Sequence, residues 1–156
     1  MSLRVGIGVD AHALAEGVPL VLGGVTIDHP RGLAGHSDGD VLAHALIDAL
    51  LGAAGLGDIG SLFPSGDERF RGADSLELLR EAYRRVREEG WLLVNADCVL
   101  VGEEPKIASH RDEMRRRLSA AVDGGEVNVR ATTTDGLGFT GRGDGLAAHA
   151  VALLER

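Results

Sequence analysis

Alternating or continuous apolar segments predict strands in several parts of the chain. One early segment carries valine or isoleucine at every second position, the spacing that puts side chains on one face of a strand. Two short apolar runs around a Gly-Gly pair predict a hairpin, and a later segment is rich in β-branched residues. The predicted strands are residues 4–9, a hairpin within 19–27, residues 92–101 and residues 127–134.

Apolar residues that recur every three or four positions predict three helices, and capping residues mark their ends. Residues 146–154 are ambiguous, because their alanines favour a helix while their length also fits a buried strand. Glycine, proline and aspartate break the remaining segments, which we expect to be loops. The helices are expected from Ser37 or Asp38 to about Ala54, from a capping-box pair Asp74 and Glu77 to Gly90, and onward from Pro105, with loops at 30–35, 55–71 and 136–145.

The length and composition fit one domain covering residues 1–156. Hydrophobic residues make up 44% of the chain but aromatic residues only 3%, so the core must consist of alanine, valine, leucine and isoleucine. Small side chains bury less area each, which favours stabilisation by oligomerisation.

The charge and cysteine content exclude several classes of protein. A formal net charge of -8 argues against a nucleic-acid partner, which needs a basic face. Cys98 is the only cysteine, so a disulfide framework is excluded. The first eight residues lack the apolar stretch of a signal peptide, and no apolar run reaches the roughly 20 residues of a membrane span. We therefore expect a cytoplasmic protein without a membrane partner.

Asp10 and His12 follow the first predicted strand two positions apart, so their side chains point to the same face. A carboxylate beside an imidazole suits zinc or manganese, although this pair alone is common by chance. One helical turn separates Asp40 from His44. His44 is either a partly buried core histidine bonded to Asp40 or a third metal ligand oriented by that carboxylate. Three protein ligands with one open position are typical of catalytic zinc.

Three further segments carry candidate chemistry, each with a simpler structural explanation. The threonines of residues 132–134 precede Asp135 and a Gly-rich turn, a set that suits phosphate oxygens and a hard cation but also reflects β-propensity. Residues 102–106 enter a predicted helix, whose N-terminus favours anions. Lys106, in this segment, is the only lysine of the chain. Residues 58–67 lie in the long loop.

Taken in order, these motifs resemble the 2-C-methyl-D-erythritol 2,4-cyclodiphosphate synthase family over essentially the whole chain. One difference stands out: position 135 carries Asp where the family usually has Glu. The motifs that carry the resemblance are Asp10-Ala11-His12, His36-Ser37-Asp38-Gly39-Asp40 with His44, residues 56–60, Phe63-Pro64, residues 72–75, Pro105-Lys106 and residues 131–143.

The resemblance implies an α+β fold, a single domain with a mixed four-stranded sheet covered by helices on one face, assembled as a homotrimer. It also implies the reaction of a phosphorus–oxygen lyase. The 2-phosphate of 4-diphosphocytidyl-2-C-methyl-D-erythritol 2-phosphate attacks the β-phosphorus, and CMP leaves without consumption of water. The first metal, zinc or manganese, would bind Asp10, His12 and His44; a second, magnesium or manganese, would bind Asp135.

The resemblance further implies roles for individual residues in this non-mevalonate step of isoprenoid biosynthesis. His36 and Thr133 would hold the diphosphate in the transition state, and Asp10 and His12 would contact the substrate through the metal. Phe139 and Arg142 would lie near a cavity on the trimer axis that binds isoprenoid diphosphates in relatives. The methylerythritol pocket would comprise Ser37, Asp58, Ile59, Gly60, Phe63, Pro64, Ser65, Gly66 and Asp67. The cytidine diphosphate pocket, from a neighbouring subunit, would comprise Gly102, Glu103, Glu104, Pro105, Lys106, Ile107, Ala108, Thr132, Thr133, Thr134 and Asp135.

Two other functions remain open from the residues alone. A phosphohydrolase would use the same three ligands to activate water. A metal or nucleotide-binding module would bind CMP without turnover.

Overall fold

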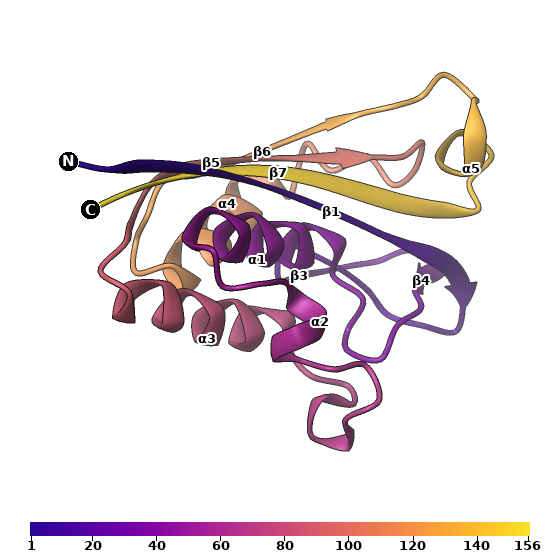
Figure 1. The fold of residues 1–156 in the computed structure, drawn as a ribbon. Helices are drawn as coiled ribbons and strands as arrows, with labels where there is room; N and C mark the ends of the chain where they lie inside the picture. The colour runs from indigo at the N-terminus through magenta and orange to yellow at the C-terminus, as the bar shows by residue number, and fades with distance from the viewer.

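One mixed sheet forms a layer of the computed structural model, which describes residues 1–156 (Figure 1). Its strands are β1 (Leu3–Glu16), β4 (Arg31–Leu33), β5 (Leu92–Val101), β6 (Val127–Thr132) and β7 (Gly145–Glu155), and a separate hairpin joins β2 (Leu20–Leu22) to β3 (Val25–Ile27). The order in the sheet is β4-β1-β7-β5-β6. The β5–β6 pair is parallel and the other pairs are antiparallel.

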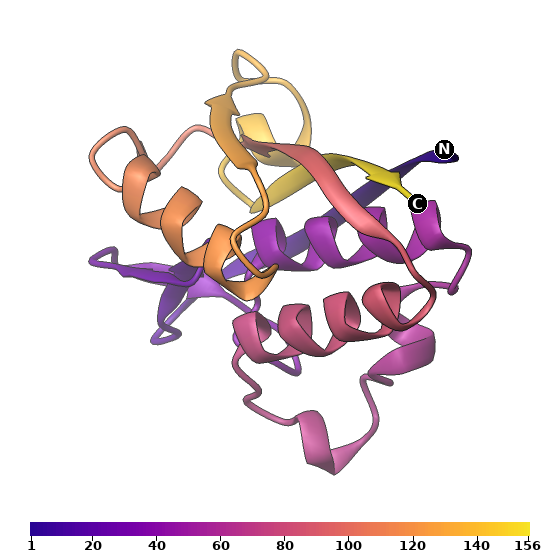
Figure 2. The same ribbon diagram turned by 90° about the vertical axis from the view of Figure 1, so that its left-hand side faces the viewer.

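The longer helices cover one face of this sheet. They are α1 (Val41–Ala54), α3 (Ser75–Glu88) and α4 (Arg111–Ala121), and the short ones are α2 (Ile59–Leu62), a 3-10 turn (Glu68–Phe70) and α5 (Gly138–Gly141). Figures 1 and 2 show α1 between the sheet and α3, with α4 on the same side. None of these helices is both long and apolar enough to cross a membrane. The core lies between these longer helices and one face of the sheet, and the other face carries only the short helix α5 at one end of β7.

Two glycines of β1 let α1 lie directly on the sheet. A Cβ atom at Gly8 would come within 1.8 Å of the carbonyl oxygen of Ala45, and one at Gly6 within 2.1 Å of that of Ala49. Larger side chains at these positions would push the helix away from the strand. The close approach brings α1 side chains within reach of those that follow Gly8 on the same face of β1.

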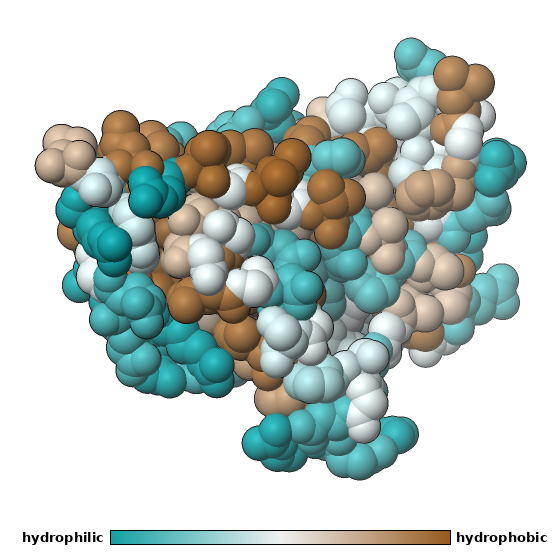
Figure 3. Space-filling view, in the orientation of Figure 1, coloured by the Kyte–Doolittle hydropathy of each residue, from teal (hydrophilic) through white to brown (hydrophobic).

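The apolar residues of the first predicted strand point away from the core. Val5, Ile7 and Val9 are 69%, 67% and 53% exposed, respectively, because Gly6 and Gly8 occupy the face toward α1. Figure 3 shows hydrophobic atoms running along this edge of the molecule. We call this surface the outer sheet face; its other exposed apolar residues are Leu3, Leu92, Val94 and Val151.

The structure confirms the α+β class, the helices on one face and the hairpin, but the sheet has five strands rather than four. The extra strand, β4, lies within residues 30–35, where a loop was predicted, and pairs with the far end of β1. The strand expected at residues 4–9 continues to Glu16, because β7 pairs with it from Leu3 to Ala13. Residues 146–154 belong to β7, so their strand alternative is correct.

Two predicted helix starts need correction, whereas the start at Asp74 is confirmed without its capping box. Asp40, rather than Ser37 or Asp38, caps α1 by accepting a hydrogen bond from the Ala43 N–H. Asp74 caps α3 through the N–H of Leu76, and the capping-box partner Glu77 instead pairs with Arg80. The helix expected from Pro105 begins at Arg111, and residues 105–108, which precede it, line a pocket.

Candidate active site

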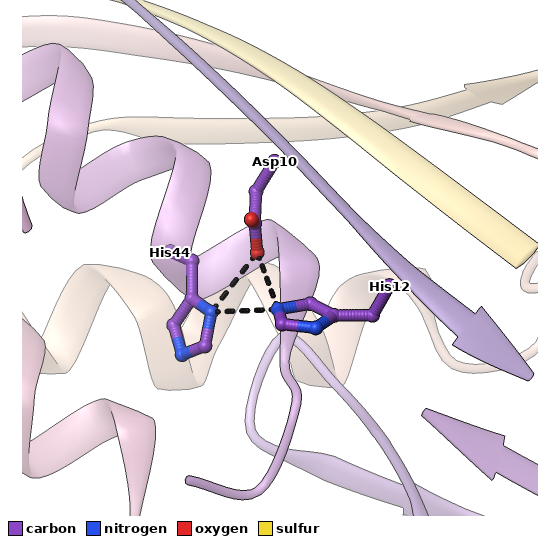
Figure 4. A group of neighbouring side chains, drawn as sticks. All are labelled: Asp10, His12 and His44. Atoms are coloured by element: carbon purple, nitrogen blue, oxygen red, sulfur yellow. Dashed lines mark hydrogen bonds and ion pairs between the residues drawn. The ribbon is translucent and has the colours of Figure 1, made fainter. Parts of the chain in front are cut away.

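Asp10, His12 and His44 converge at the contact between β1 and α1. The Asp10 Oδ2 atom lies 2.9 Å from His12 Nε2 and 3.0 Å from His44 Nδ1, and the two nitrogens are 3.4 Å apart. Figure 4 shows both rings directing one nitrogen at the same carboxylate oxygen. Asp10 and His12 come from the middle of β1, rather than from the end of a strand as the sequence suggested, and His44 comes from the first turn of α1.

These three atoms fit a bound divalent metal ion. Ligands held tetrahedrally at about 2.0–2.1 Å from zinc lie about 3.3 Å from one another, close to the separations seen here. Burial alone would raise the pKa of Asp10, but hydrogen bonds to His12 and His44 outweigh it and lower the pKa to about 2. The hydrogen bond to Asp10 is also the main reason that the pKa of His12 is raised. The site therefore keeps an ionised carboxylate beside two imidazoles, a donor set that suits zinc or manganese.

His44 is buried, and its second ring nitrogen has two hydroxyl partners. His44 Nε2 lies 3.0 Å from Ser37 Oγ and 2.8 Å from Ser75 Oγ. The predicted contact with Asp40 is wrong. Asp40 is fully buried and accepts hydrogen bonds from the backbone N–H groups of the β2–β3 turn as well as from α1.

A cavity of about 400 Å³ opens beside the three metal-ligand candidates. His36 lines it, and a hydrogen bond of 2.7 Å joins its Nε2 to the backbone carbonyl oxygen of Asp67. We call this the first cavity; the predicted pocket residues that line it are Ser37, Ile59, Gly60, Phe63, Pro64, Ser65 and Gly66.

Two predicted residues do not line the first cavity. The Asp58 side chain caps α2, and that of Asp67 pairs with Arg69. Phe70 and Leu78 line the cavity although sequence reasoning missed them. The apolar spacing of its helix showed only that Leu78 is buried, and Phe70 lies in the predicted 55–71 loop, where no periodic pattern marked it.

A second cavity of about 220 Å³ lies at the carboxyl ends of the parallel strands β5 and β6. The predicted residues that line it are Gly102, Pro105, Lys106, Ile107, Ala108, Thr132 and Thr133. Sequence reasoning missed Leu100, Ala131, Leu146 and Arg111. The Nε atom of Arg111 is buried without a hydrogen-bond partner, which no sequence pattern signals. The two cavities share no residue.

The remaining predicted residues lie on the exposed loop after β6 or face it. Thr133 Oγ1 donates to the Asp135 carboxylate at 3.2 Å, and Asp135 has a φ of 52°, in the left-handed region. Asp135 does not belong to the group formed by Asp10 and the two histidines. Glu103 accepts a hydrogen bond from the N–H of Gly136.

The other predicted residues near this loop also lie outside the two cavities. The hydroxyl of Thr134 is hydrogen-bonded to that of Thr140, and Glu104 does not line the second cavity. Phe139, in α5, is 43% exposed, and Arg142 pairs with Asp144. One chain therefore does not gather Asp135, Phe139 or Arg142 around either cavity.

Comparisons with known proteins agree with the motifs. The model of the YgbB family matches residues 3–155. The 2-C-methyl-D-erythritol 2,4-cyclodiphosphate synthase of Rubrobacter xylanophilus is 62% identical, with 98% of this chain and 95% of the relative aligned. The synthase of Moorella thermoacetica is 58% identical, with 97% of this chain and 94% of the relative aligned.

Two solved structures extend the likeness to three dimensions. A 2C-methyl-D-erythritol-2,4-cyclodiphosphate synthase in a form bound to CDP superposes with a TM-score of 0.88 at 44% identity, covering 97% of this chain and all 100% of that one. The bifunctional IspDF of Campylobacter jejuni superposes with a TM-score of 0.93 at 46% identity, covering 98% of this chain and 42% of that protein.

Proposed function

The chain belongs to the YgbB family, whose curated relatives are 2-C-methyl-D-erythritol 2,4-cyclodiphosphate synthases, and from this premise we propose that it closes the cyclic diphosphate of isoprenoid biosynthesis. The substrate is 4-diphosphocytidyl-2-C-methyl-D-erythritol 2-phosphate. Its 2-phosphate oxygen bonds to the β-phosphorus, the bond from that phosphorus to the bridging oxygen breaks, and CMP leaves. The observation that carries this proposal is the Asp10, His12 and His44 group opening onto the first cavity.

Two divalent metals serve this reaction. Asp10, His12 and His44 would hold zinc or manganese, and Asp135 would hold magnesium or manganese together with the substrate. When bound, the metals neutralise charge on the phosphates. Phosphoryl transfer depends mainly on this charge neutralisation and on positioning, rather than on covalent catalysis by the protein. The chain itself positions the reacting groups, because a ring closure depends on holding nucleophile and phosphorus in line.

In this proposal the two parts of the substrate bind in different cavities. His36 and Ser37 face the methylerythritol phosphate and the diphosphate in the first cavity. Lys106 and Thr133 face the cytidine diphosphate in the second. The support for this division is that the sugar-side motifs line one cavity and the nucleotide-side motifs line the other.

We include a homotrimer in the proposal, in which one substrate bridges the first cavity of one subunit and the second cavity of its neighbour; the separate linings of the two cavities fit this arrangement. The outer sheet face supports it: side chains such as Val5, Ile7 and Val9 leave an apolar surface that a monomer would keep in water. Phe139 and Arg142 would then approach the trimer axis, where an isoprenoid diphosphate binds. Sedimentation should give three times the 16.3 kDa of one chain, and Ile7→Glu should release monomers.

One assay separates this function from its rivals. The metal-loaded protein is incubated with the cytidylyl substrate, and products are followed by phosphorus NMR. The proposal requires CMP and a cyclic diphosphate in equal amounts. CMP with a linear phosphorylated product would indicate a phosphohydrolase, and metal-dependent CMP binding without turnover would indicate a binding module.

A further inference from the structure

Ser75 is a fully buried polar residue that the proposed reaction leaves without a role. It begins α3, remote in sequence from β1 and α1, yet its hydroxyl lies 2.8 Å from the Nε2 atom of His44. We propose that Ser75, held by Asp38, is a positioning residue that directs the metal-binding lone pair of His44. This inference rests on the metal site of the proposed function.

The argument begins with the carboxylate of Asp38. One oxygen accepts the backbone N–H of Ser75 at 3.0 Å, and the other accepts the N–H of Asp40 at 3.1 Å and the hydroxyl of Ser75. An ionised carboxylate accepts hydrogen bonds and donates none. The single hydroxyl proton of Ser75 is therefore directed at Asp38.

With its proton committed, the Ser75 oxygen faces His44 as an acceptor. The Nε2 atom of His44 must then carry the proton of this hydrogen bond. A neutral imidazole has one N–H and one lone pair, so a metal ion that takes the place of the proton shared by Nδ1 and Asp10 would meet the lone pair on Nδ1. Nδ1 is the atom that points at Asp10 in Figure 4, where the metal would bind.

Ser37 offers a comparison within the same site. Its hydroxyl also lies within hydrogen-bond distance of His44 Nε2, at 3.0 Å, but no carboxylate holds its proton. The Ser37 hydroxyl is consequently free to donate or to accept, so it does not select one tautomer. Ser75→Ala and Ser37→Ala therefore form a matched pair, because each removes one hydroxyl oxygen that lies within hydrogen-bond distance of His44 Nε2.

The test measures zinc affinity by competition with a chelator. Removing a hydrogen-bond partner of a metal ligand typically weakens metal binding by about 10–100-fold, and we expect this for Ser75→Ala. Ser37→Ala should weaken it by less than about threefold. Equal effects of the two substitutions, or unchanged zinc affinity in Ser75→Ala, would overturn the proposal.

Asp38→Asn tests the direction of the hydrogen bonds while Ser75 stays in place. The amide group can donate to the Ser75 oxygen, which frees the hydroxyl to donate to Nε2 and favours a proton on Nδ1. Zinc affinity should fall as in Ser75→Ala, with the thermal midpoint of the zinc-free protein recording any loss of folding separately. Retained wild-type affinity would contradict the inference.

A spectroscopic measurement on the unaltered protein needs no variant to fold. In zinc-loaded protein with labelled histidine, the Nε2 proton of His44 should give a downfield signal that exchanges slowly with water. A signal typical of a solvent-exposed imidazole would rule out the bond to Ser75. If His44→Ala itself keeps zinc, the metal site of the proposed function has failed instead, and the two failures are thereby distinguished.

Discussion

The two cavities differ in how completely one chain organises them. In the first, Asp10, His12 and His44 already lie at ligand-like separations. Beside the second, Thr133 contacts Asp135, which lies outside the cavity on an exposed loop and does not join the Asp10, His12 and His44 group. One chain therefore preorganises the first cavity, whereas under the proposed function the second would depend on the substrate and a neighbouring subunit for its order.

The physical reason is where each cavity lies in the fold. The candidate metal ligands project from the middle of β1 and the first turn of α1, which pack against each other through Gly6 and Gly8. The second cavity is built at strand ends, and connections between strands are generally more mobile than the strands they join. Substitutions in the first cavity and near the second should therefore affect different properties of the protein.

The largest expected effect comes from His44→Ala, which removes one of three candidate ligands from the preorganised first cavity. Zinc content by elemental analysis should fall from one ion per chain to nearly none. Turnover should fall by about 1,000-fold or more, since a metal contributes several kcal/mol to such a step. Binding of CDP to the second cavity should survive, and its loss would show that the two cavities are not independent.

Asp135→Ala tests the loop beside the second cavity and should have the next largest effect. We expect turnover to fall on the order of 100-fold, the usual result of removing one group that stabilises transition-state charge. The activity should become less responsive to magnesium, while zinc content stays at the wild-type value. Loss of both metals would mean that the sites cannot be separated as proposed.

Asp40, the buried residue that caps α1, should make the stability of the fold depend on pH. Burial raises the pKa of Asp40 to about 6, although N–H groups of Gly23, Gly24 and Ala43 oppose the rise. Because the folded pKa exceeds the ordinary value of 3.8, this side chain stabilises the fold most below about pH 4 and loses that contribution as pH rises through 6. The change amounts to about 3 kcal/mol.

Urea unfolding of wild type and Asp40→Asn at several pH values, at one protein concentration, measures this contribution. The difference between their unfolding free energies should change between pH 4 and 6 and level off above that range. A difference that is constant across this range would show that Asp40 is ionised throughout, held so by its three N–H donors.

Lys106→Met should have the smallest effect of the series. It removes one positive charge from the second cavity, and CDP affinity should fall about tenfold, or 1.4 kcal/mol. Zinc content should not change, which makes this variant the counterpart of His44→Ala. Calorimetry with CDP provides the measurement, and Lys106→Arg, which keeps the charge, should recover part of the affinity. A wild-type affinity in Lys106→Met would remove this residue from the nucleotide site.

The sequence predicted which three residues converge as candidate metal ligands better than it predicted the elements that carry them. The two-residue spacing of Asp10 and His12 is compatible with one face of a strand wherever that strand ends, so the prediction survived although β1 continues to Glu16. His44 was predicted with the wrong partner. Asp40 is one helical turn away, but as the residue that caps α1 its carboxylate turns back to backbone N–H groups.

The sequence alone determined the family, the set of candidate ligands, the α+β class and the hairpin, because motifs and local periodicity are properties of neighbouring residues. The tertiary structure decided which partners meet across long sequence separations: Ser75 with His44, Arg111 with the second cavity, and β4 with the end of β1. It also decided that Val5, Ile7 and Val9 face outward. Alternation identifies two faces of a strand, but only the helix packed on Gly6 and Gly8 shows which face is the core.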